Sequence, residues 1–201
     1  YDMLRSLVGS EMCIRDRHHH NLLGQWFISS SIMGRFAVST MFFHEYPCDQ
    51  IFDYIAGSGF DSLEFWVETP HFWVRGCPED ELSDCIASHP ELSPITVHAP
   101  SLDMNPCSIN PRVAAISVEY AIEAIRMAER IGAALVTVHP GRRTAKREPS
   151  APDYTRFEAY VAGLREAAEE TGVKVAIENM EPRINTPVSY THLTLPTIYS
   201  V

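Results

Sequence analysis

Three residues that can bind a metal ion each end a short apolar run of the sequence. His98 ends ITVH, His139 ends ALVTVH, and Glu178 ends KVAIE. Imidazole nitrogens and a carboxylate oxygen are ligands of zinc, and manganese and iron also accept them. If the runs are neighbouring parallel strands, their carboxyl ends bring these side chains to one place. We therefore predict a divalent metal centre, for Zn, Mn or Mg, built from His98, His139 and Glu178.

A purely structural role is the alternative to metal binding for each of these residues. A single His at a strand end more often satisfies a hydrogen bond than binds a metal, but three equivalent positions in succession favour a site. Glu64, in the run SLEFW, is a candidate ligand, catalytic base or supporting residue, although an ion pair with a neighbouring Arg or Lys would also explain it. His44 is a weaker candidate, because an exposed loop accounts for it equally well.

Strand-like and helix-like runs alternate around these positions. Asn110 and Pro111 are typical of a helix start, and Gly172 is typical of a helix end. The alternation predicts an α/β fold with a parallel sheet covered by helices. The predicted strands are residues 36–40, 62–66, 95–98, 134–139 and 174–178, and the predicted helices are residues 47–58, 78–89, 110–131 and 154–171.

An open doubly wound sheet and a closed barrel share this alternation. No glycine-rich phosphate-binding turn follows the first predicted strand, where a dinucleotide-binding sheet would carry one. The polar strand ends favour the barrel. We therefore predict a partial TIM (β/α)8 barrel comprising about the first five βα units.

Both ends of the chain are expected to lie outside this domain. Residues 1–17 and 188–201 resemble translated sequencing-adapter text, and the histidines and short apolar run that follow residue 17 resemble a tag or an untranslated leader. We expect residues 1–32 to be an artefactual or untranslated and disordered leader, residues 33–187 to be the N-terminal part of the barrel, and residues 188–201 to be an artefactual tail. A natural chain is expected to continue beyond Pro187.

The composition excludes some classes of protein. A formal net charge of −10 argues against a generally cationic nucleic-acid or membrane-surface binder. The apolar run near the start is too short and too interrupted for a membrane span. The cysteines outside the leader form no CxxC pair, so neither a disulfide framework nor a zinc finger is indicated, and a reducing cytoplasm is expected. They are Cys48, Cys77, Cys85 and Cys107.

A basic loop follows His139 directly. Its sequence, GRRTAKR, places guanidinium groups beside the predicted metal centre, where they suit bidentate phosphate recognition. An exposed loop balanced by Glu148 and Asp153 is the alternative interpretation. The candidate phosphate-binding residues are Arg142, Arg143 and Arg183, with Lys146 and Arg147 as further cations.

The motifs HAP, VHPG and IEN, with a long helix between the first two, resemble the xylose isomerase-like TIM-barrel superfamily. This group includes sugar phosphate isomerases and epimerases and the endonuclease IV class of AP endonucleases, AP endonuclease family 2. The resemblance implies a divalent-metal barrel. In endonuclease IV-like members it implies a three-zinc cluster with His98, His139 and Glu178 among the ligands, whereas in the epimerases it implies carboxylates that bind the metal and move a proton. Further ligands and the second catalytic Glu are expected beyond residue 187.

Two enzyme classes and an inactive fragment remain as hypotheses. The first is a metal-dependent isomerase or epimerase of a small-molecule sugar or sugar phosphate, with Glu64 and Glu178 as catalytic residues. The run SLDMNPCSIN after HAP lacks an aromatic or basic platform for a nucleic-acid strand, which favours this class. The alternative is an endonuclease IV-like zinc nuclease, for which DNA would be the partner. The sequence leaves the oligomeric state open.

The third hypothesis is that the chain has no activity. Five βα units cannot close an eight-stranded barrel. The first and the fifth strand are then expected to present unpaired edges, which favour aggregation or self-association.

Overall fold

The computed structural model describes residues 36–43, 45–142 and 150–178, together with the backbone of residues 198–200. The chain divides into two units, Tyr1–Gly34 and Arg35–Val201. All described residues belong to the second unit, and the fold is that of this unit.

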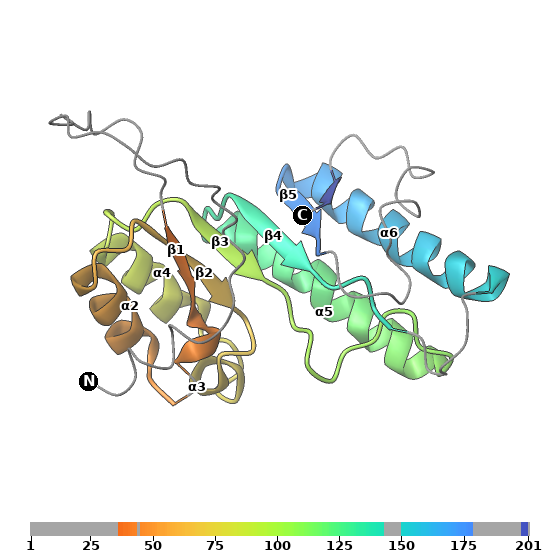
Figure 1. The fold of residues 1–201 in the computed structure, drawn as a ribbon, viewed down its shortest axis with the longest axis horizontal. Helices are drawn as coiled ribbons and strands as arrows, with labels where there is room; N and C mark the ends of the chain where they lie inside the picture. The colour runs from red at the N-terminus through yellow and green to blue at the C-terminus, as the bar shows by residue number, and fades with distance from the viewer. Residues whose placement is uncertain (1–35, 44, 143–149, 179–197, 201) are drawn as a thin grey trace, which may run out of the picture. The chain divides into compact units, whose positions relative to one another are not determined.

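Six parallel strands form one sheet in the order of the sequence (Figure 1). Parallel neighbours need a long crossover, and helices occupy the described crossovers. The predicted α/β fold with a parallel sheet is therefore confirmed. The strands are β1 (Ala37–Ser39), β2 (Ser62–Trp66), β3 (Ile95–His98), β4 (Leu135–Val138), β5 (Lys174–Ile177) and β6 (Ile198–Ser200).

The helices pack on the sheet and on one another. The long helix α5 packs against β3, β4 and α6, while α6 packs against β5 and α2 against α4. Figure 1 shows α5 and α6 lying alongside each other. Their bounds are η1 (Thr40–Phe42), α2 (Cys48–Gly57), α3 (Pro70–Trp73), α4 (Glu79–Ser88), α5 (Pro111–Arg130) and α6 (Ala151–Thr171). Within the described ranges, no helix has both the length and the apolar character that a membrane crossing requires.

Capping residues set the starts of the two long helices. The Asn110 side-chain oxygen accepts a hydrogen bond from the N–H of Arg112 at 3.1 Å, as predicted for α5. Helix α6 begins three residues before its predicted start, because Ser150 and Asp153 form a capping box. Asp153 accepts from the backbone N–H and the hydroxyl of Ser150 at 2.8 and 2.7 Å. Its buried carboxylate therefore caps the helix.

The first strand is shorter than predicted because the chain leaves the sheet at Thr40. The buried Thr40 hydroxyl accepts a hydrogen bond from the N–H of Trp66 at 2.9 Å and lies 2.8 Å from the hydroxyl of Thr69. These contacts fix Thr40, and the N–H of Phe43 donates to its carbonyl at 2.9 Å, which closes the turn η1. Helix α3 was not predicted, because a single turn carries no helical periodicity in the sequence.

Alternation along the strands separates two sets of side chains. One set is fully buried with apolar helix residues in the hydrophobic core, and the intervening residues face the opposite side of the sheet. The core set includes Leu63, Phe65, Val97, Val136, Val138 and Ile177. The second set, which includes Glu64, Trp66, His98 and Thr137, is the set available for ligand binding.

The sixth strand lies within the run that we predicted to be an artefactual tail. The backbone of β6 pairs in parallel with β5, with Ala176 opposite Tyr199. The prediction of an unpaired edge on the fifth strand is therefore wrong. The run IYS is β-branched and aromatic, a composition that fits a strand. The domain bounds 33–187 stay a prediction.

Candidate metal centre

The three predicted ligands lie at the carboxyl ends of three neighbouring strands. His98 is the last residue of β3, and His139 and Glu178 directly follow β4 and β5. Backbone pairing continues past the strand ends, since the N–H of Ala99 donates to Thr137 at 2.9 Å and that of Glu178 to Val138 at 3.0 Å. The sheet therefore places all three side chains at one edge.

The three side chains meet around the Glu178 carboxylate. Its Oε2 lies 2.9 Å from Nε2 of His139 and 3.6 Å from Nε2 of His98. The two imidazole rings are nearly perpendicular, at 87°, with centroids 4.9 Å apart. One ligand atom from each residue lies within 4.8 Å of the others. Within the described part of the chain, no other three His, Cys, Asp or Glu residues come together in this way.

A backbone contact orients the His98 ring. Its Nδ1 lies 2.9 Å from the carbonyl oxygen of Ala99, so this nitrogen carries the proton and donates. In the neutral ring Nε2 is then the nitrogen with a lone pair, and it faces Glu178. Such a carbonyl contact behind the ring is typical of imidazoles that bind metals.

The electrostatics of the centre favour a bound cation. Contacts with the imidazoles of His139 and His98 hold the pKa of Glu178 far below its usual range. Burial disfavours the charged form of His98, but the bond to Glu178, the Glu64 charge and the Ala99 carbonyl outweigh burial and raise the pKa of His98. The ionised Glu178 carboxylate thus favours positive charge on His98. A divalent cation can take the place of the His98 proton.

The donor set fits a divalent transition metal. Two imidazole nitrogens and one carboxylate oxygen suit zinc and iron well and manganese acceptably. Magnesium prefers oxygen ligands, so it fits the three side chains least.

The centre forms part of the wall of a cavity of about 520 Å³. This volume is in the range of small-molecule sites. The remaining lining combines three hydroxyl-bearing side chains, one carboxylate and four apolar side chains. They are Ser39, Ser101 and Thr137, then Glu64, then Met41, Trp66, Leu102 and Leu135.

Glu64 lies in this cavity, as its position in β2 predicted. It sits in register between Ser39 of β1 and Thr96 of β3, with its side chain half-buried among the lining residues. Its charge contributes to the raised pKa of His98. Trp66 was not predicted, although it lies two residues further along the same strand. The two-residue period of a strand is the signal that identifies it.

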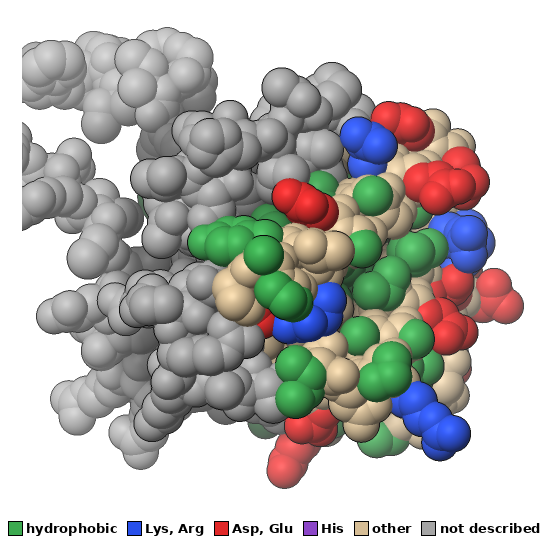
Figure 2. All heavy atoms as spheres, turned by 90° about the vertical axis from the view of Figure 1, so that its right-hand side faces the viewer, with side chains coloured by type: hydrophobic (Ala, Val, Ile, Leu, Met, Phe, Trp, Pro, Cys, Tyr) green, Lys and Arg blue, Asp and Glu red, His purple; other side chains and the backbone are tan. Residues whose placement is uncertain are grey.

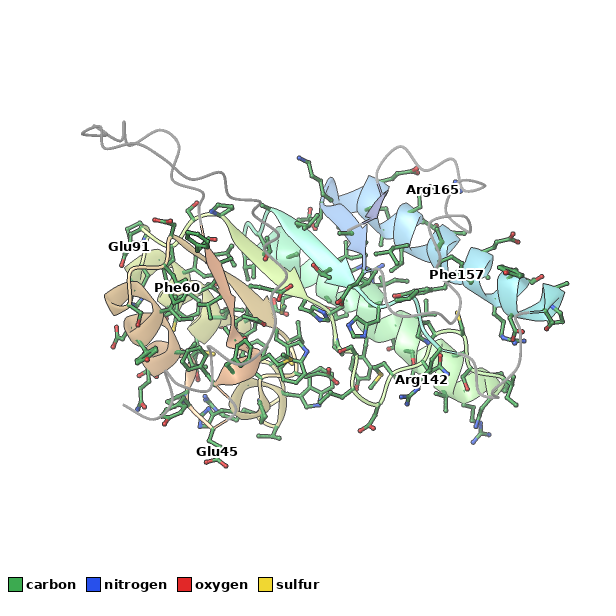
Figure 3. All side chains as sticks on the ribbon, viewed as in Figure 1. Glu45, Phe60, Glu91, Arg142, Phe157 and Arg165 are labelled. Carbon is green, nitrogen blue, oxygen red and sulfur yellow. The ribbon has the colours of Figure 1, made fainter. Side chains whose placement is uncertain are left out.

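The predicted phosphate-binding residues are not gathered in the described cavity wall. Arg142, labelled in Figure 3, is exposed and does not line the cavity. Arg143 and Arg183 lie outside the described residues, as do Lys146, Arg147 and His44. Figure 2 shows the face over the starts of α5 and α6, where acidic, basic and apolar side chains are interspersed.

Three side chains from other segments hold the backbone that follows His139. Tyr160 donates to the carbonyl of His139 at 3.2 Å, and the Cys107 thiol donates to the next carbonyl, that of Pro140, at 3.3 Å. The side-chain oxygen of the buried Asn105 accepts from the backbone N–H three residues after His139, at 2.9 Å. The sequence did not reveal these contacts, because each joins residues that are distant along the chain.

Gly141 completes the junction between the loops after β3 and β4, where an added side chain would be crowded and the backbone conformation strained. Its φ is +83°, and an added Cβ would lie 3.1 Å from the backbone nitrogen of Cys107 and 3.2 Å from the side-chain oxygen of Asn105. The glycine of the VHPG motif therefore allows the loops after β3 and β4 to approach each other.

Proteins of known sequence are similar to this chain. The uncharacterized protein MJ1188 of Methanocaldococcus jannaschii is 33% identical over 153 residues, which are 76% of this chain and 56% of that protein. The uncharacterized protein MJ1311 of the same organism is 30% identical over 153 residues, covering 73% of this chain and 49% of that protein. The chain therefore spans about half the length of these relatives.

Solved structures of sugar epimerases superimpose on the chain. A D-tagatose 3-epimerase-like protein has a TM-score of 0.66 and 26% identity, covering 82% of this chain and 63% of that chain. An L-ribulose 3-epimerase has a TM-score of 0.68 and 20% identity, covering 84% of this chain and 60% of that chain. The sequence profile of the xylose isomerase-like TIM barrel matches residues 52–198. As the motifs indicated, the chain belongs to the xylose isomerase-like TIM barrel family.

Proposed function

We propose that the protein is a metal-dependent isomerase or epimerase of a sugar or sugar phosphate, with His98, His139 and Glu178 as ligands of a divalent cation. The observation that carries the proposal is the convergence of three ligand atoms within 4.8 Å on the wall of a small-molecule cavity. The fold supports the reaction class, because similar structures include D-psicose 3-epimerases studied with D-fructose and D-tagatose.

Different residues of the cavity lining bind the cation, move the proton and exclude water. A bound cation would polarise a sugar carbonyl or hydroxyl oxygen and so ease proton removal from the neighbouring carbon. Glu64, in the same cavity, is the group that accepts this proton at its carboxylate oxygen and returns it. Glu178 serves the reaction by holding the cation. The apolar side chains of Trp66 and Met41 exclude water from the reacting carbon.

A phosphorylated substrate would place its phosphate near the loop after His139. We assign its recognition to Arg142, Arg143 and Arg183, because guanidinium groups bind phosphate oxygens in pairs. The assignment rests on the proximity of Arg142 and Arg143 to His139 in the sequence, so the substrate panel includes ketose phosphates.

Carbon-bound hydrogen exchange tests the proposal. The protein is stripped with a chelator, reloaded with Zn²⁺, Mn²⁺ or Mg²⁺, and incubated in D₂O with D-fructose, D-tagatose and ketose phosphates. Proton NMR is expected to show exchange at one carbon in a reloaded sample and none in the stripped sample. Glu64→Gln is expected to keep the metal and to slow exchange about a hundredfold or more. Exchange at the wild-type rate in this variant would remove Glu64 as the base, and no exchange with any sugar and metal would reject the proposal.

An endonuclease IV-like AP endonuclease is the second candidate. The observation in its favour is the ligand set itself, two His and one Glu on consecutive strand ends, which the resemblance associates with a zinc cluster. The same metal-loaded preparations are incubated with a duplex oligonucleotide that contains one abasic site. Strand cleavage without sugar exchange would replace the epimerase proposal by the nuclease.

A further inference from the structure

A buried carboxylate outside the metal centre holds the loop that follows His98. Glu68, just after β2, is only 7% exposed. Its Oε2 accepts hydrogen bonds from the backbone N–H groups of Ser101, at 2.6 Å, and Leu102, at 3.0 Å. Oε1 makes a longer contact of 3.3 Å with the same N–H of Leu102. Glu68 thus joins the loops after β2 and β3.

These hydrogen bonds explain why a carboxylate is buried at this position. Removing a charge from water is costly unless charge-assisted hydrogen bonds replace its hydration. Backbone N–H groups satisfy this requirement in a fixed geometry, because they cannot rotate away as side chains can. The carboxylate therefore fixes the positions of two consecutive residues of the loop.

Both held residues line the cavity that contains the metal centre. Leu102 is 61% exposed although it is apolar, so burial in the protein does not set its position. The contact between its backbone and Glu68 does. An apolar side chain held at a cavity wall while facing solvent is available to a ligand.

We infer that Glu68 is a positioning residue for substrate binding, which holds Leu102 and Ser101 as the part of the cavity wall that contacts the sugar. The inference rests on the proposed function. A sugar offers C–H surface for Leu102 and hydroxyl groups for Ser101. Because neither residue is a ligand of the metal centre, loss of this wall weakens binding of substrate and transition state alike.

Steady-state kinetics with D-tagatose or D-fructose test this role in the metal-loaded full chain. Glu68→Ala is expected to raise KM about tenfold with kcat within about twofold, and Leu102→Ala to do the same. The double variant is expected to resemble either single variant, because both changes remove the same wall. Glu68→Gln keeps an acceptor oxygen and is expected to stay within about threefold of the wild type.

Asp153→Asn is the matched control. Asp153 is equally buried, at 3% exposed, but it caps α6 and does not line the cavity. This variant is expected to lose thermal stability while KM is unchanged. An unchanged KM in Leu102→Ala would overturn the inference, and so would a KM in Asp153→Asn that rises as much as in Glu68→Ala.

Amide hydrogen exchange separates this inference from the proposed function. The amides of Ser101 and Leu102 are expected to exchange at least about tenfold faster in Glu68→Ala and at the wild-type rate in Asp153→Asn. Unchanged exchange in Glu68→Ala overturns the inference whether or not the protein acts on sugars. If the wild type processes no ketose but the amides of Ser101 and Leu102 exchange faster in Glu68→Ala, the proposed function fails. The role of Glu68 in holding the loop then stands.

Discussion

Two His–carboxylate contacts in this molecule have nearly the same length and different surroundings. Nε2 of His89, at the end of α4, lies 3.0 Å from Oδ1 of Asp53 in α2. At the carboxyl ends of β4 and β5, Nε2 of His139 lies 2.9 Å from Oε2 of Glu178. By distance alone the two pairs are equivalent.

The difference lies in what else each ring and carboxylate contacts. His89 also uses Nδ1, at 2.8 Å from the carbonyl of Cys85, and Asp53 is 76% exposed. Both nitrogens of His89 are therefore occupied, Nδ1 by its own helix α4 and Nε2 by Asp53 of α2. Glu178, in contrast, is shared by two imidazoles on the wall of a cavity. Convergence of several donors on a cavity, more than any single distance, distinguishes a candidate metal centre from a structural pair.

The largest effect is expected from His139→Ala, which tests whether the His139–Glu178 pair differs from the His89–Asp53 pair in binding a metal ion. Removing one of three ligands leaves too few donors to hold a cation, so bound metal is expected to fall from about one per chain to near zero. Elemental analysis after dialysis measures it. His89→Ala is the matched control and is expected to keep the wild-type stoichiometry; unchanged metal in His139→Ala would contradict the ligand assignment.

The next largest effect is expected from Gly141→Ala, which tests how closely the loops after β3 and β4 pack together near His139. The new Cβ would meet the Cys107 backbone and Asn105 in a left-handed conformation, so a loss of about 3 kcal/mol of unfolding free energy is expected. Gly172→Ala is the control, because Gly172 has a similar φ of +72° with open space around it, and about 1 kcal/mol is expected there. Urea unfolding of the metal-free variants measures both losses of unfolding free energy. Equal losses would show that the contacts with Cys107 and Asn105 add no steric cost at Gly141.

The pH dependence of metal binding is a second test of the difference between the candidate metal centre and the His89–Asp53 pair. The pKa of His98 is raised and that of Glu178 is lowered, so on acidification His98 gains a proton while Glu178 is still ionised. Metal affinity is therefore expected to fall about tenfold per pH unit below the raised pKa of His98. Competition with a fluorescent chelator measures it. His89→Ala should show the same dependence, and a flat profile would show that the cation does not displace the proton of His98.

The smallest effect is expected at the surface pair. The Cys85 carbonyl and Asp53 raise the pKa of His89, so the pair stabilises the fold below the ordinary pKa of 6.5, and this contribution is lost as pH rises through the raised value. Asp53→Asn is expected to cost about 0.5 kcal/mol at acidic pH, since exposure of Asp53 screens the pair, and nothing measurable at alkaline pH. Urea unfolding at both pH values checks it; a cost that grows with pH would have the wrong sign.

The sequence predicted the elements whose signals are local or periodic. His98, His139 and Glu178 follow apolar strand runs, and Asn110 marks the start of α5, so their positions could be inferred without the structure. The start of α6 was misplaced because Asp153 was interpreted as a partner of the basic loop. In the structure it caps the helix and bonds Arg156.

Contacts between distant segments could not be predicted. Asn105 and Tyr160 act on the backbone near His139 across more than twenty residues of sequence, and Glu68 acts on Leu102 across a separation of thirty-four. Nothing in the residue types of these side chains indicates their partners, since their hydrogen bonds depend on how the strand-end loops meet. Alternation along β2 was sufficient to place Glu64 in the cavity, and the same rule places Trp66 there.

The junction of Gly141 with Asn105 also bears on how this fold can change. Asn105 accepts a hydrogen bond from the N–H of Arg142, so the position of the backbone at Arg142 is fixed by Asn105 and not by the residues that follow. Replacement of residues 143–149 by a segment of different charge is therefore expected to alter which ligands are attracted while His139 keeps its place. Under the proposed function, such an anchor lets ligand recognition by this segment and chemistry at the metal centre vary separately, in natural divergence and in protein engineering alike.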